Sequence, residues 1–173
     1  MTSPANAPST YSPDPALDLV LQRVVDVPPS LVWRAWTEPE LLKPWFTPKP
    51  WSTVDCEIDL RPGGIFKVVM QSPEGKTFAH PGCYLEVVPR ERLVWTSALL
   101  PGYRPNLTDS EADGGAFPFT CILTLEPNGA GTKYTAIALH GDPSTKTKHE
   151  AMGFHDGWST ALDQLVEHVR RIG

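Results

Sequence analysis

The stretch His149-Glu-Ala-Met-Gly-Phe154-His-Asp-Gly-Trp158, running into Ser159-Thr-Ala-Leu162-Asp-Gln-Leu165-Val-Glu-His-Val169, decides the fold of this chain. No proline occurs over 148–172, and apolar side chains recur at intervals of three and four residues, the period of an amphipathic helix. We therefore expect one long closing helix over 148–172. Gly153 and Gly157 fall in its first turns, where each costs about 1 kcal/mol relative to alanine. We expect another part of the chain to approach closely at these two positions.

Upstream of this helix the pattern changes to that of strands. Apolar and polar residues alternate over 17–27, the period of a half-buried strand. Two short helices follow, over 31–36 with Ser30 as N-cap and over 38–43 with Thr37 as cap. We then expect six consecutive antiparallel strands, over 53–59, 65–70, 77–88, 92–99, 116–125 and 132–140. This order predicts an α+β fold whose sheet curls around the closing helix and leaves a pocket between them.

The length of 173 residues and the mass of 19.1 kDa suit one domain. Residues 1–16 are rich in proline, serine and threonine and have little apolar surface to bury, so we expect a disordered tail before a single domain over 17–173. The stretch 101–115 is rich in glycine, proline and acidic residues and is expected to be a mobile loop.

Charge and composition exclude several classes of partner. The formal net charge of -5 and the pI near 5.5 give no attraction to nucleic acid, and no segment has the length or hydropathy of a membrane span or a signal peptide. We therefore expect a soluble, cytoplasmic protein. The three cysteines are odd in number and widely spaced, which favours reduced thiols over a disulfide framework.

Several ordered motifs resemble those of a known family. They are Val27-Pro-Pro-Ser-Leu-Val-Trp33-Arg-Ala-Trp36, Asp59-Leu-Arg-Pro-Gly-Gly64, Gly82-Cys-Tyr-Leu-Glu86, Gly131-Thr132 and the stretch 149–158. Together they resemble the activator-of-heat-shock-chaperone-ATPase homologue branch of the START/Bet v 1-like superfamily. The resemblance implies a helix-grip fold, in which a curved antiparallel sheet of about seven strands wraps the C-terminal helix around a cavity for apolar molecules. It implies less about function, because members include lipid carriers, polyketide cyclases and chaperone regulators.

Large side chains on the expected inner surface are candidates for lining a cavity. Trp45, Phe46 and Trp51 lie in a proline-broken loop and could form either a pocket rim or an interface. Further candidates come from the strands and the closing helix: Trp95, Phe119, Cys121, Met152 and Trp158. For the strand aromatics, ordinary core packing is the competing interpretation, since most buried rings only pack.

Four polar residues are candidates for orienting a ligand. His140 ends the last strand and His155 shares the helix stripe of Met152, so both could face the cavity mouth as a base or a hydrogen-bonding group, or could simply be satisfied structurally. Arg23 and Glu86 interrupt strongly patterned strands and could pair with each other or with a ligand carboxylate, although such an arginine more often extends its charge to solvent.

Three hypotheses follow for function. The first is binding of a small hydrophobic or amphipathic molecule between sheet and helix. The second is a cavity enzyme of cyclase, dehydratase or hydrolase type, for which no catalytic motif is recognised. The third is a chaperone-regulating interaction module with Trp45, Phe46 and Trp51 as its surface patch. The histidine and cysteine spacings fit no metal site, so we expect no metal and no cofactor, and a homodimer or a chaperone partner remains open.

Overall fold

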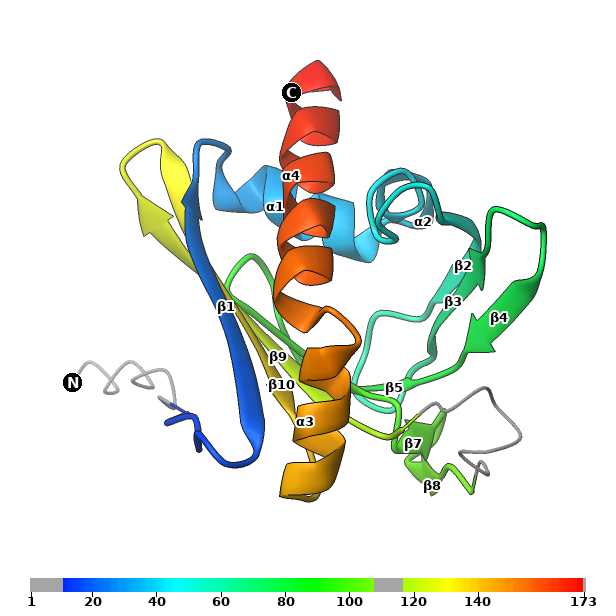
Figure 1. The fold of residues 1–173 in the computed structure, drawn as a ribbon. Coiled ribbons are helices and arrows are strands. Elements are labelled where there is room, and N and C mark those ends of the chain that lie inside the picture. The colour runs from blue at the N-terminus through cyan, green and yellow to red at the C-terminus, as the bar shows by residue number, and fades with distance from the viewer. Residues whose placement is uncertain (1–10, 108–116, 173) are drawn as a thin grey trace.

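The computed structural model describes residues 11–107 and 117–172 (Figure 1). The elements follow in the order β1 Asp18–Val25, α1 Pro29–Thr37, α2 Pro39–Leu42, β2 Ser52–Ile58, β3 Phe66–Gln71, β4 Thr77–His80, β5 Cys83–Val88, β6 Arg92–Thr96, β7 Leu99–Leu100, β8 Arg104–Pro105, β9 Thr120–Asn128, β10 Gly131–Leu139, α3 Pro143–Ala151 and α4 Phe154–Ile172.

The strands form two main sheets that meet at one corner. A five-stranded antiparallel sheet has the order β1-β10-β9-β6-β5, and a three-stranded sheet has the order β2-β3-β4. A bridge between Ile65 and Cys83 joins them, and the Tyr84 N–H donates to the Gly64 carbonyl at 3.0 Å. Figure 1 shows α4 lying between the two sheets. The predicted α+β helix-grip fold, with a curved antiparallel sheet and a long C-terminal helix, is confirmed.

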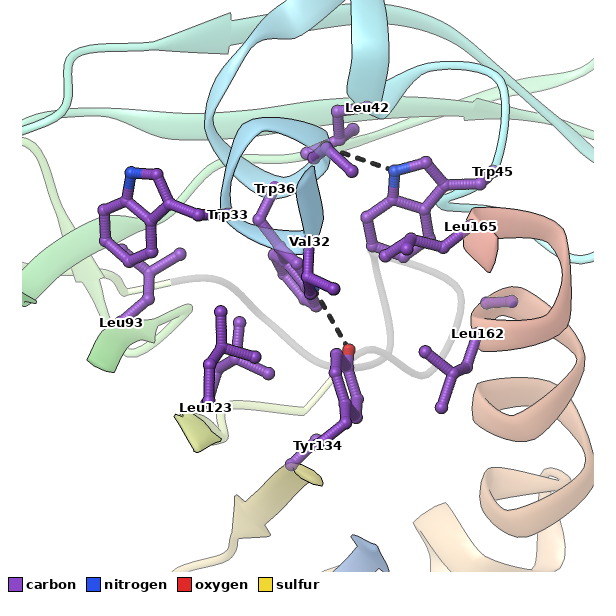
Figure 2. Packing of buried hydrophobic residues seen from close by; sticks show 14 of the residues in the cluster. Val32, Trp33, Trp36, Leu42, Trp45, Leu93, Leu123, Tyr134, Leu162 and Leu165 are labelled. Atoms are coloured by element: carbon purple, nitrogen blue, oxygen red, sulfur yellow. Dashed lines mark hydrogen bonds between the residues drawn. The ribbon is translucent and has the colours of Figure 1, made fainter. Parts of the chain in front are cut away.

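The main core lies where α1, the loop after α2 and α4 meet the inner face of the larger sheet. Trp36 of α1 donates from its indole nitrogen to the hydroxyl of Tyr134 on β10 at 3.1 Å, as Figure 2 shows. Trp45 follows α2, is 2% exposed, and donates to the Ala35 carbonyl at 3.1 Å. Leu165 of α4 is also part of this buried cluster. These contacts fix one end of α4 against the helical layer.

The expected single closing helix is two helices. Asp142 caps α3 by accepting a hydrogen bond from the Thr145 N–H at 2.7 Å, and α3 ends before Gly153, which has a φ of 94°. A side chain at Gly153 would meet nothing within 4 Å, and one at Gly157 would meet only a side-chain atom of Pro48 at 3.9 Å. The expected close approach at these glycines is therefore wrong. Gly153 is suited to its position by backbone conformation, which breaks the helix there.

Other boundaries also differ from the sequence pattern. The N-cap of α1 is Pro28 and that of α2 is Glu38, and neither side chain caps its helix, so the predicted caps Ser30 and Thr37 are wrong. Thr37 instead donates back to the Trp33 carbonyl at 2.8 Å. The strand expected over 77–88 is interrupted between β4 and β5, where the chain passes from the smaller sheet to the larger one.

The chain before β1 is attached to the domain at Tyr11. Its hydroxyl donates to the Asp18 carboxylate at 2.6 Å, and the Asp14 N–H donates to the same carboxylate at 2.8 Å. The expected tail thus has an anchored end at 11–14. The part of that prediction over 1–10 and the part of the expected mobile loop over 108–115 lie outside the described residues.

Candidate functional site

A row of inward-facing residues crosses the larger sheet at one level. Tyr84 on β5 is paired with Trp95 on β6, Trp95 with Cys121 on β9, and Cys121 with Ala138 on β10. Directly paired residues in antiparallel strands point to the same face. All four are buried, with Trp95 the most accessible at 7%. The row therefore forms part of the floor beneath the helices.

Aromatic rings pack over the end of this row formed by Tyr84 and Trp95. Phe66 of β3 lies between them, with ring centroids 5.3 Å from Tyr84 and 4.9 Å from Trp95. Phe119 lies 5.4 Å from Trp95, and Phe46 lies 6.0 Å from Phe66. The corner between the two sheets is consequently an aromatic interior, which we call the aromatic corner and define by Phe66, Tyr84, Trp95 and Phe119.

Two hydrogen-bond donors in the aromatic corner have no partner. Among the described residues, neither the Tyr84 hydroxyl nor the Trp95 indole nitrogen finds a hydrogen-bond acceptor, although both atoms are buried. Burial raises the pKa of the Tyr84 hydroxyl far above its usual value, so the group keeps its proton. An unpaired buried polar group of this kind costs about 1–3 kcal/mol. The aromatic corner therefore holds two unsatisfied polar groups on neighbouring strands.

A pair of buried histidines lies beside the aromatic corner. His140 Nδ1 is 2.8 Å from the Leu17 carbonyl, and His140 Nε2 is 2.8 Å from His149 Nδ1. Because a carbonyl only accepts, the neutral His140 ring carries its proton on Nδ1 and accepts at Nε2, so His149 donates from Nδ1. Burial, together with nearby His140, lowers the pKa of His149 to about 4. Four other rings surround His149 at 4.9–6.0 Å: Phe117, Phe119, Phe154 and Trp158.

Most of the apolar candidates from the sequence are buried or half-buried, but they lie in different parts of the fold. Trp95 and Cys121 belong to the buried row, while Phe119 and Trp158 are half-buried near His149. Trp45 is fully part of the core and Phe46 packs against it. Trp51 is 38% exposed and packs on Phe78 at 5.6 Å. The three loop aromatics therefore do not gather into one exposed patch, as the interface interpretation required.

Two candidates of the closing helix face solvent. Met152 is 66% exposed, and the His155 side chain is 57% exposed and contacts Glu150 at 3.1 Å. Their expected position on a cavity-facing stripe is wrong, because the break at Gly153 ends the helical register from which that stripe was predicted. His149, which the sequence analysis did not single out, takes the inward position instead. The Asp142-Pro143 pair, a helix-start signal, could have indicated the separate helix that carries it.

The pairing of Arg23 with Glu86, one of the alternatives considered for these two charges, does not form. Their strands, β1 and β5, are the two opposite edges of the five-stranded sheet. A bulge between Tyr84 and Glu86 pairs Glu86 with Val94 rather than with an inward residue, and its carboxylate accepts from Arg92 at 3.0 Å. Arg23 instead donates to the Asp163 carboxylate on α4 at 2.7 Å. Neither charge is therefore placed in the aromatic corner.

Two open grooves of about 320 and 340 Å³ lie near the end of β1. Among the sequence candidates only Arg23 lines one of them, so the interior cavity stays a prediction. No cluster of three metal-binding side chains occurs among residues 11–107 and 117–172. In the same residues, no helix has the length and apolar character needed to cross a membrane.

One family model and several solved structures resemble this chain. Residues 26–170 match the family model described as Activator of Hsp90 ATPase homolog 1-like protein. Protein NE0264 from Nitrosomonas europaea is 51% identical, with a TM-score of 0.84 over 91% of this chain and 97% of that one. The AHSA1 protein from Silicibacter pomeroyi shares the fold at 19% identity, with a TM-score of 0.65 over 90% of this chain and 99% of that one. No curated protein matches the sequence.

Proposed function

The chain belongs to the Activator of Hsp90 ATPase homolog 1-like family, and on that premise we propose that it binds a small, largely apolar molecule in the aromatic corner. The observation that carries the proposal is the pair of buried donors without partners, the Tyr84 hydroxyl and the Trp95 indole N–H. Sites for small molecules are typically apolar with a few well-placed polar groups. A ligand with an accepting oxygen would satisfy both donors at once.

The chemistry of the aromatic corner defines the ligand class. The rings would supply affinity through apolar burial, at about 25 cal/mol per Å². The indole N–H of Trp95 only donates and the Tyr84 hydroxyl can also donate, so together they favour an acceptor such as a carbonyl, ether or hydroxyl oxygen. Arg23, the one sequence candidate with a positive charge, is engaged with Asp163 on the far edge of the sheet. A neutral acceptor is favoured over a carboxylate, because a buried carboxylate would lack a countercharge.

The two other hypotheses have less support. The chaperone-regulating module was based on a surface patch of loop aromatics, but Trp45 is buried in the core. The enzyme hypothesis retains His140, whose ring forms a hydrogen-bonded pair with His149. Both ring nitrogens of His140 already have partners, the Leu17 carbonyl and His149, so His140 has a structural role that needs no substrate. Cytoplasmic location and the state of association remain predictions from the sequence.

Binding of the neutral naphthyl ketone prodan tests the proposal. Its emission shifts on transfer to an apolar site, and its carbonyl can accept from both donors. We expect saturable, stoichiometric binding to the native protein. Tyr84→Phe and Trp95→Phe should each weaken binding about 5- to 10-fold, the value of one hydrogen bond. The matched control is Tyr103→Phe, since Tyr103 is 52% exposed. Failure of the parent to bind, or equal binding by all variants, would overturn the proposal.

A further inference from the structure

The helix α3 has an unusual composition for an element packed on a domain. Its sequence, Pro143-Ser-Thr-Lys-Thr-Lys-His-Glu-Ala151, has one buried residue, His149. Most other positions of α3 are exposed. A helix with no apolar stripe gains little from packing, so it is among the elements that open at low free energy.

A glycine lies close to each end of this helix. Gly141 precedes the N-cap Asp142, and Gly153 follows the C-terminal residues of α3 with a φ of 94°. Around both glycines, a side chain would meet no atom within 4 Å. Hinges are usually short segments that absorb changes in backbone angles without steric conflict. The two glycines allow α3 to move relative to β10 and α4.

His149 makes the buried contact between α3 and the rest of the domain. It is 8% exposed and hydrogen-bonds His140, which is itself fixed to the Leu17 carbonyl. The other ties between α3 and its surroundings are at the surface. Lys148 Nζ lies 5.7 Å from the ring centre of Phe117, and Glu150 contacts the exposed His155. Exposed contacts of this type contribute little, because water and salt compete for the charges.

Beneath His149 lies the edge of the aromatic corner. The Phe119 ring centre is 5.0 Å from that of His149 and 5.4 Å from that of Trp95. Phe119 is half-buried and packs against both the His149 ring of α3 and the Trp95 ring, whose indole nitrogen has no partner among the described residues. Moving α3 away would expose Phe119 further and uncover this side of the aromatic corner.

We propose that α3 is a lid over the aromatic corner, hinged at Gly141 and Gly153 and held closed by His149. The inference rests on the proposed function for what the lid covers, but the opening of α3 is a property of the protein alone. Since only one residue of α3 is buried, the lid opens without unfolding α4, whose buried face runs from Phe154 to Val169. Entry and release of the ligand then depend on how often His149 leaves its place.

Amide hydrogen exchange followed by mass spectrometry tests the opening without any ligand. In the parent protein, amides of α3 should exchange faster than those of 161–169 in α4. His149→Phe keeps a ring but loses the hydrogen bond, and should speed exchange of α3 about 3- to 10-fold; His149→Ala should speed it further. Exchange over 161–169 should stay unchanged. The control Thr147→Ala alters an exposed residue of the same helix and should leave both segments as in the parent.

Stopped-flow mixing with prodan then tests whether the moving helix covers the site. His149→Phe and His149→Ala should raise the association rate by the same factor as the α3 exchange rate, and Thr147→Ala should not. Equal protection of α3 and α4, or faster α3 exchange with an unchanged association rate, would overturn the lid. Failure of the proposed function is recognised separately, because prodan would then not bind the parent at equilibrium. If prodan does not bind, the exchange rates still test the hinge. Faster amide exchange in α3 than in α4 supports a hinged α3, and equal or slower exchange in α3 overturns it.

Discussion

Replacing two buried tyrosines by phenylalanine should change stability in opposite directions. Tyr84 and Tyr134 both lie on the inner face of the larger sheet, at 0% and 3% exposure. Burial raises the pKa of both hydroxyls well above the usual value, so both are neutral. They differ in one respect. The Tyr134 hydroxyl accepts from the indole nitrogen of Trp36 at 3.1 Å, whereas the Tyr84 hydroxyl has no partner among the described residues.

The magnitudes follow from what each change leaves behind. Tyr134→Phe removes the acceptor and leaves the buried indole N–H of Trp36 unpaired, which should lower the free energy of unfolding by about 1–3 kcal/mol. Tyr84→Phe removes a hydroxyl that lost its hydration without gaining a hydrogen bond. That change should raise the free energy of unfolding by about 1 kcal/mol. The two variants should therefore differ by about 2–4 kcal/mol, although the chemical change is the same.

Urea denaturation followed by tryptophan fluorescence measures both effects. The slope with denaturant should match the parent in both variants, so that the shift in midpoint reports stability alone. Thermal unfolding should agree, at about 2–4 °C for each kcal/mol in a domain of this size. If Tyr84→Phe lowered stability by more than about 1 kcal/mol, the hydroxyl would have a partner in the folded protein. The argument for an unsatisfied donor in the aromatic corner would then fail.

Three further changes test other parts of the structure. Gly153→Ala should destabilise by about 1–2 kcal/mol because of its positive φ, whereas Gly157→Ala should stabilise by up to about 1 kcal/mol in urea unfolding, since it lies within α4. The lowered pKa of His149 means that the unfolded chain binds the proton more readily, so stability should fall by about 2 kcal/mol from pH 7 to pH 5, and His149→Phe should remove this dependence. Asp142→Ala should speed hydrogen exchange in the first turn of α3, since the hydrogen bond to the Thr145 N–H, worth about 1 kcal/mol, is lost; unchanged exchange would contradict the cap.

The sequence predicted the strands well where alternation was long and uninterrupted. The expected strand over 132–140 corresponds to β10, Gly131–Leu139, and that over 17–27 contains β1, Asp18–Val25. Both strands are long, and their buried residues alternate in part with more exposed ones. The local alternation is enough to predict such strands, because successive side chains of a strand point to opposite faces of the sheet.

The sequence predicted the site less well, for two local reasons. Regular alternation would place Glu86 on the same face as Tyr84, but the bulge between them turns Glu86 away from the inner face. The positive φ at Gly153 separates α3 from the amphipathic α4, so the stripe of α4 does not extend back to Met152, and His149 is the residue of α3 that lies inside. Both features are single-residue departures from regular geometry. They change which face every following side chain occupies, and a periodic pattern averaged over many residues does not register them.

The sizes of the side chains along the buried row explain why the unpaired donors are at one end of the sheet. The row runs from Tyr84 and Trp95 on β5 and β6 to Cys121 and Ala138 on β9 and β10. At the small end, Phe154 of α4 packs into a cluster with Ala138, which lets the helix lie close to the sheet. At the large end the tyrosine and the indole pack against rings, since Phe66 of the smaller sheet contacts both and Phe119 contacts the indole. A ring offers no strong acceptor, which fits the absence of a partner for either donor among the described residues.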